Sequence, residues 1–116
     1  MKVAVIGSRG YTEFHTIVDF LSGLKQHYGN DLEIISGGAD GPDRIAELWC
    51  KANGVKIKVI PADFENGGKS AGIKRNTQII DNADQVLAFW DGESSGTLDG
   101  IVKAKKTKKP VQVSLA

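Results

Sequence analysis

The chain has 116 residues, of which 41% are hydrophobic and 25% charged, a composition typical of one folded domain over residues 1–116 rather than of a disordered segment. Fifteen basic and fourteen acidic side chains leave a net charge of +1, so no overall field draws the chain to nucleic acid or to an anionic membrane. The single cysteine, Cys50, excludes an internal disulfide and a cysteine-built metal site, and no metal is expected. No apolar run has the length of a membrane span or the form of a secretion signal, so the expected compartment is the cytoplasm.

Five short apolar runs predict β-strands. Each is bounded by glycine, proline or polar residues, which is typical of buried strands that end in turns. The runs cover residues 2–6, 32–36, 55–60, 85–89 and 110–115.

Apolar residues at helical spacing separate these strands and predict four helices. The first is expected over residues 12–28, with Thr12 as N-cap and Gly29 as its end. The second begins at Pro42, a residue favoured in the first helical turn, and ends at Asn53-Gly54. The third ends near Asn82, after a loop over residues 62–71. The fourth follows a loop over residues 90–95 and carries Leu98, Ile101 and Val102.

Strands that alternate with helices predict an α/β fold with a parallel sheet covered by helices on both faces. Ligands of such sheets bind beyond the carboxyl ends of the strands, where the strand order reverses. The segments that follow the strands are therefore the first place to look for a site.

Three of these segments are rich in glycine and lead into a predicted helix. Their small residues would let backbone amides approach an anion, with the positive ends of the helix dipoles behind them. The alternative is that the glycines only make tight turns. If the sheet is parallel, all three meet at one crevice, which favours a ligand site. The segments are Gly7-Ser8-Arg9-Gly10, Gly37-Gly38-Ala39-Asp40-Gly41 and Asp91-Gly92-Glu93-Ser94-Ser95-Gly96-Thr97.

Cations at two predicted helix starts indicate an anion nearby, because they oppose the helix dipole. Arg44 follows Asp43 in the second helix, and Arg75 precedes Asn76 in the third; solvated surface is the alternative. Trp90 either stacks on a base or caps the core. The lysines at the end of the fourth helix complement its dipole.

The motifs taken together resemble the SLOG superfamily, and within it a small branch related to the YspA and YpsA proteins. The resemblance implies a Rossmann-like three-layer sandwich with strand order 3-2-1-4-5 and a nucleotide-type ligand between the first and fourth strands. It is carried by Val3–Arg9, Ser36–Ala39 with Gly41, Asp43 and Arg44, Lys74–Asn76, Ala88–Gly92 and Ser95–Thr97.

Better-known relatives, the LOG phosphoribohydrolases, carry the motif P-G-G-x-G-T-x-x-E with a catalytic glutamate and a partner arginine. Gly96-Thr97 match this motif, Arg75 matches the arginine, and the glutamate position falls on Gly100. Asp99 stands one residue early, and one residue turns a side chain by about 100° around a helix. The resemblance makes Arg75 and Asp99 the candidate catalytic residues.

The leading expectation is a protein that binds a nucleotide or nucleotide-derived small molecule (nucleoside phosphate, NAD or ADP-ribose type) and needs no cofactor. Two alternatives stay open: an N-glycosidase acting on a nucleoside monophosphate, and a single-stranded-DNA-associated or protein-interaction module like the DNA-processing members of the superfamily. The near-neutral charge argues against nucleic acid as a partner, and analogy with relatives suggests a homodimer. The expected ligand contacts are Gly7, Ser8, Arg9, Gly37, Gly38, Ala39, Asp43, Arg44, Asn76, Asp91, Ser95, Gly96 and Thr97.

Overall fold

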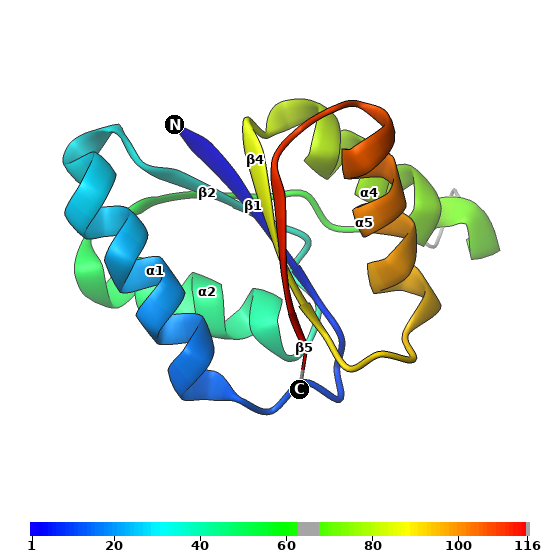
Figure 1. Ribbon diagram of the computed structural model, residues 1–116, viewed down its shortest axis with the longest axis horizontal. Coiled ribbons are helices and arrows are strands. Elements are labelled where there is room, and N and C mark those ends of the chain that lie inside the picture. Colours follow the sequence, from blue (N-terminus) through cyan, green and yellow to red (C-terminus); the bar gives the residue numbers. More distant parts are fainter. Residues whose placement is uncertain (63–67, 116) are drawn as a thin grey trace.

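The computed structural model describes residues 1–62 and 68–115. Figure 1 shows one twisted sheet between two pairs of helices. All strand pairs are parallel and the order is β3-β2-β1-β4-β5. This confirms the predicted α/β class, the Rossmann-like architecture and the order 3-2-1-4-5. The elements are β1 (Lys2–Gly7), α1 (Phe14–Tyr28), β2 (Glu33–Ser36), α2 (Pro42–Asn53), β3 (Lys56–Val59), α4 (Ala71–Asn82), β4 (Gln85–Trp90), α5 (Ser95–Lys106) and β5 (Val111–Leu115), with short 3-10 turns η1 (Gly29–Asp31) and η2 (Gly68–Ser70).

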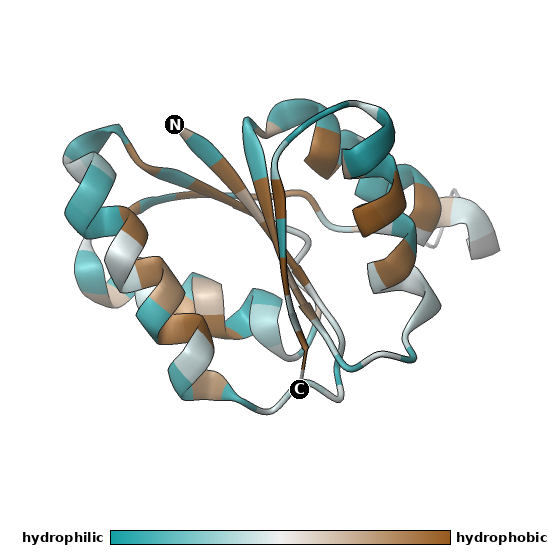
Figure 2. Ribbon diagram, viewed as in Figure 1, coloured by the Kyte–Doolittle hydropathy of each residue, from teal (hydrophilic) through white to brown (hydrophobic). Residues whose placement is uncertain are grey.

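The central strand β1 is buried on both faces, because helices cover both sides of the sheet. Val3 and Val5 point to one face and pack with α1 and α2, whereas Ala4 and Ile6 point to the other and pack with α4 and α5. This alternation is the two-residue period of a strand. Figure 2 shows the apolar residues concentrated along the central strands.

Each pair of helices buries an apolar stripe against its own face of the sheet. The α1–α2 layer contributes Ile17, Leu21 and Trp49, and Phe89 of β4 completes that cluster. The α4–α5 layer contributes residues such as Ile79 and Ile101 to the second cluster. The two layers lie on opposite sides of the sheet (Figure 1).

The start of α1 differs from the prediction. The helix begins at Phe14 rather than near Thr12, and Glu13 holds the N-cap position without a side-chain cap. The reason is a turn between the strand and the helix: the Tyr11 amide donates to Ser8 O, and the Tyr11 ring is buried against Phe89.

Pro42 is the first residue of α2, as predicted. Of the loop predicted over 62–71, residues 63–67 lie outside the described part of the chain.

Across residues 1–62 and 68–115, no helix has both the length and the apolar character needed to cross a membrane.

Candidate functional site

A cleft of about 310 Å³ lies at the carboxyl ends of β1 and β4, where the strand order reverses. Three connections border it: β1 to α1, β2 to α2, and β4 to α5. Nine of the residues expected from the sequence line this cleft. They are Gly7, Arg9, Ala39, Asp43, Arg75, Asn76, Asp91, Gly96 and Thr97.

Four further residues line the cleft that were not among the expected contacts. Ile6 is the second-last residue of β1, and Gly10 and Ser94 belong to the glycine-rich segments after β1 and β4. Ile79 lies one helical turn after Arg75 on α4, so the four-residue spacing of a helix face could have identified it. Ile6 and Ile79 are core residues, 5% and 1% exposed, that form part of the wall behind the charged groups of the cleft.

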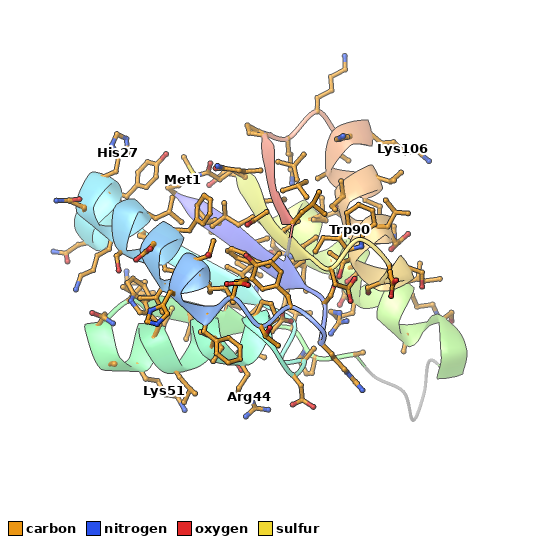
Figure 3. All side chains as sticks on the ribbon, turned by 60° about the horizontal axis from the view of Figure 1, so that its bottom comes forward. Met1, His27, Arg44, Lys51, Trp90 and Lys106 are labelled. Carbon is orange, nitrogen blue, oxygen red and sulfur yellow. The ribbon has the colours of Figure 1, made fainter. Side chains whose placement is uncertain are left out.

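Six expected site residues do not line the cleft. Arg44 projects outward from α2 (Figure 3), and its Nε lies 3.7 Å from Glu47 Oε2. The solvated-surface alternative therefore describes Arg44 better than a ligand contact does. The others, which lie behind or beside the lining residues, are Ser8, Gly37, Gly38, Ser95 and Asp99.

The amides of the β2–α2 connection are already hydrogen-bonded within the protein. Asp43 Oδ2 accepts from the amides of Gly37 at 3.0 Å and Ala39 at 3.4 Å, and Ser36 Oγ accepts from the Gly38 amide at 3.2 Å. The expectation that these amides point at a bound anion is therefore wrong for this connection. The buried Asp43 carboxylate accepts hydrogen bonds that were expected to go to the ligand.

Gly37 has a different role from the expected one, because it makes room for Arg75. A Cβ built on Gly37 would lie 2.6 Å from Nη1 of Arg75 and 3.0 Å from its Cζ. Nη1 donates to the Gly37 carbonyl at 3.0 Å, and Nε donates to Asn76 Oδ1 at 3.3 Å. The guanidinium thus packs against Gly37 and is held at the cleft by two hydrogen bonds.

Hydroxyl groups join the two connections that follow β1 and β4. Ser8 Oγ and Thr97 Oγ1 are 3.0 Å apart and buried, and Ser8 Oγ accepts from the Asp91 amide at 3.3 Å. Asp91 Oδ1 in turn accepts from the amides of Ser94 at 2.8 Å and Glu93 at 2.9 Å, which hold the pKa of Asp91 below its ordinary value. Ser8 is therefore a support for the cleft rather than a contact within it.

The candidate acid of a hydrolase, Asp99, is occupied elsewhere. Its Oδ2 lies 2.9 Å from Nζ of Lys103 and accepts from Asn76 Nδ2 at 3.3 Å. Gly100, at the family's glutamate position, faces the core, where an added Cβ would lie 2.6 Å from Ile6 Cδ1. Neither position presents an acid among the lining residues, so the geometry gives the prediction of Asp99 as a catalytic residue no support.

Among the described residues that line the cleft, the electropositive groups are two arginines and the N-terminal end of α5. Arg9 is exposed, and Arg75 is half-buried. The amides of Ser95 and Gly96 have no intrahelical acceptor, because they lie in the first turn of α5. An ideal Cβ on Gly96 would meet no atom within 4 Å, so this helix end is open to a guest.

Trp90 is half-buried and caps the core, and it is not one of the residues that line the cleft. It packs against the α4–α5 cluster, and its Nε1 donates to Ser94 O at 3.0 Å at the end of β4 (Figure 3). The described residues contain no group of three or more His, Cys, Asp or Glu side chains placed to hold a metal ion.

Comparisons with known proteins agree with this architecture. The Gene 61 protein of Mycobacterium phage D29 is 34% identical over 95% of this chain and 93% of its own length. Among solved structures, DNA processing protein A of Streptococcus pneumoniae matches 97% of this chain with a TM-score of 0.81 and 22% identity. DNA processing protein A of Helicobacter pylori, which has a single-stranded DNA binding mode, matches 97% with a TM-score of 0.77 and 23% identity.

At these identities the two solved structures establish the fold alone. This chain spans 49% of the Streptococcus protein and 64% of the Helicobacter protein, so both relatives carry further chain outside the shared fold. The family model of the YspA, cpYpsA-related SLOG family matches residues 1–67, which include the connections after β1 and β2. The chain therefore belongs to the YspA, cpYpsA-related SLOG family.

Proposed function

We propose that this protein binds single-stranded DNA, and that the cleft at the ends of β1 and β4 holds the strand. The observation that carries the proposal is that Arg9, Arg75 and the N-terminus of α5 border one cleft. Guanidinium groups and helix N-termini are the groups that proteins use to hold phosphates. The likeness to a protein with a single-stranded DNA binding mode points to a strand as the source of the phosphates.

The size and lining of the cleft favour a strand over a duplex. A volume of about 310 Å³ is at the lower end for small-molecule pockets, so it suits one nucleotide unit of a longer strand. A base pair is too wide for a cleft of this volume, whereas a single unpaired base can enter it. The described lining residues include no aromatic ring, so the proposed contact with a base does not depend on stacking.

The net charge of +1 is compatible with this mode of binding, because phosphate contacts depend on the charges at the cleft and not on the sum over the whole chain. The lysines at the end of α5, among them Lys106, lie at the opposite end of that helix from the cleft (Figure 3). Binding is then local, through few phosphates, and its salt dependence should be shallow.

This proposal replaces two expectations from the sequence. The solved structures that share this fold correct both the small nucleotide-derived ligand and the argument from net charge against nucleic acid, since they are DNA processing proteins and one has a single-stranded DNA binding mode. The net charge misled because it averages over the surface, whereas phosphate contacts are local. Asp99 pairs with Lys103 and does not line the cleft, so the N-glycosidase alternative has no support from the geometry.

The test is fluorescence anisotropy with a labelled oligothymidylate of about 16 nucleotides, the upper end of the site size of a small single-strand-binding domain. The diagnostic variant is Gly96→Glu, which places an acidic side chain in the open cleft at the start of α5. A glutamate suits a helix N-terminus and should not harm folding. The matched control is Gly23→Glu on α1, which changes the charge equally and also meets no atom within 4 Å.

Saturable binding by the wild type and by Gly23→Glu, with loss of binding by Gly96→Glu, is the expected result. A wild-type protein that is folded and yet leaves the anisotropy of the strand unchanged at low salt would contradict the proposal. Equal binding by both variants would place the strand on another surface.

A further inference from the structure

Asp43 is a carboxylate in an unusual position, beneath the cleft at the first turn of α2. Its side chain is 4% exposed and lies among the residues that line the cleft. Oδ2 holds the β2–α2 connection in place through the amides of Gly37 and Ala39. One oxygen of the carboxylate is thus fully used in building the loop.

The other oxygen, Oδ1, has no hydrogen-bond donor from the protein. Among the described residues, it is the one buried side-chain oxygen or nitrogen without a hydrogen-bond partner. Leaving a buried acceptor unpaired typically costs about 1–3 kcal/mol, and more for a charged group. Burial also raises the pKa of Asp43 to about 6, although the Ala39 amide and the Arg75 charge oppose this shift.

Loop construction does not explain this oxygen. A single acceptor atom satisfies both amides, so an asparagine would serve the loop without a buried charge. Nor is Oδ1 the partner of the nearby guanidinium, since no hydrogen bond joins them and Arg75 donates to Gly37 O and Asn76 Oδ1 instead. Because Asp43 lines the cleft, a guest bound there is the candidate donor for this oxygen.

The chemistry of that guest is restricted by the charge of the carboxylate. A phosphate is repelled by Asp43 and belongs with Arg9 and Arg75 at the same cleft. The sugars inside a DNA strand carry no 2′-hydroxyl group, so they have nothing to donate. The hydrogen-bond donors that remain in a single strand are the N–H groups of its bases.

We infer that Oδ1 of Asp43 accepts a hydrogen bond from a base N–H of the bound strand, while the arginines hold its phosphates. The inference rests on the proposed function and adds a second kind of contact to it. The site then distinguishes a strand that carries base donors from a strand that offers phosphates alone.

The experiment compares two strands and two variants in the same anisotropy assay. One strand is an oligothymidylate, whose bases each offer one N–H at N3, and the other is the same strand methylated at N3. Asp43→Asn keeps an oxygen for the loop amides but puts an NH₂ group in place of Oδ1. Asp40→Asn is the matched control, because it removes an equal charge from an exposed residue of the same connection that does not line the cleft.

The wild type and Asp40→Asn are expected to bind the unmodified strand about tenfold more tightly than the methylated strand, since a hydrogen bond to a charged group contributes on this scale. Asp43→Asn should bind the two strands about equally. If methylation merely adds bulk, Asp43→Asn will still discriminate, and the inference is overturned. Circular dichroism confirms folding, and the wild-type comparison of the two strands needs no variant.

Failure of this inference is distinguishable from failure of the proposed function. Equal binding of both strands by the wild type overturns the base contact and leaves the strand-binding function intact. Absence of binding to either strand removes both.

Discussion

Arg9→Ala tests the proposal that the cleft holds a strand by its phosphates, because Arg9 is the cleft arginine whose loss should disturb the fold least. Its side chain is exposed, whereas Arg75 is hydrogen-bonded to Gly37 and Asn76 and lies over the loop. Removing Arg9 should therefore remove one phosphate contact without disturbing the fold. Arg44→Ala is the control, because Arg44 is an exposed arginine that does not line the cleft.

The size of the effect follows from the number of arginines at the cleft. Each phosphate contact to a single strand contributes about −0.7 to the slope of log K against log salt concentration, so two arginines give about −1.4. Between about 50 and about 200 mM salt, the wild type should lose about sevenfold in affinity. Arg9→Ala, with one contact left, should lose only about 2.6-fold over the same range.

The assay is a set of anisotropy titrations of the labelled oligothymidylate at four or more salt concentrations for the three proteins. The wild type and Arg44→Ala should share one slope, and Arg9→Ala should show half of it. An unchanged slope in Arg9→Ala would refute the assignment of a phosphate to this arginine. A slope reduced equally in Arg44→Ala would show that the strand follows a different surface.

Three further predictions concern stability and reactivity. Gly7→Ala should lower the free energy of unfolding by about 1–3 kcal/mol in urea denaturation, because the new Cβ would lie 2.4 Å from Pro42 Cγ; an unchanged midpoint would contradict this close approach. The raised pKa of Asp43, about 6 against 3.8, means that the native state binds a proton more tightly than the unfolded state, so wild-type stability should fall relative to Asp43→Asn as pH rises from about 4 to about 6. The stability of Asp43→Asn relative to the wild type should rise by about 2 kcal/mol over this window, and a constant difference in stability would refute the shift. Burial raises the pKa of Cys50 to about 11, so its reaction with Ellman's reagent at neutral pH should be far slower in the native protein than in urea; equal rates would show that the thiol is accessible.

The fold could be predicted from the sequence because its signals are local and repeated. The run Val3–Ile6 ends in glycine, Pro42 begins a helix, and each strand alternates with a helical stripe. The start of α1 was harder to predict, because the turn that moves it to Phe14 depends on the burial of Tyr11 against Phe89, a residue far away in the sequence.

The location of the candidate cleft could be predicted from the sequence, but its hydrogen bonds could not. The glycine-rich segments meet at the carboxyl edge of the sheet, as the parallel topology requires. Whether their amides are free depends on where other side chains lie, and the path of the loop decides that Asp43 accepts from Gly37. Likewise, the contact between Gly37 and Arg75 joins residues 38 positions apart, and no local pattern encodes it.

The buried hydroxyl pair of Ser8 and Thr97 has a consequence for what the cleft can admit. Together with the Asp91 amide, it ties the segments after β1 and β4 to each other behind the cleft. Widening the opening would break hydrogen bonds that no solvent can replace at that depth. The opening of the cleft should therefore keep a constant width. Guests that are broader than this opening are then excluded by their shape, whatever their charge or base identity.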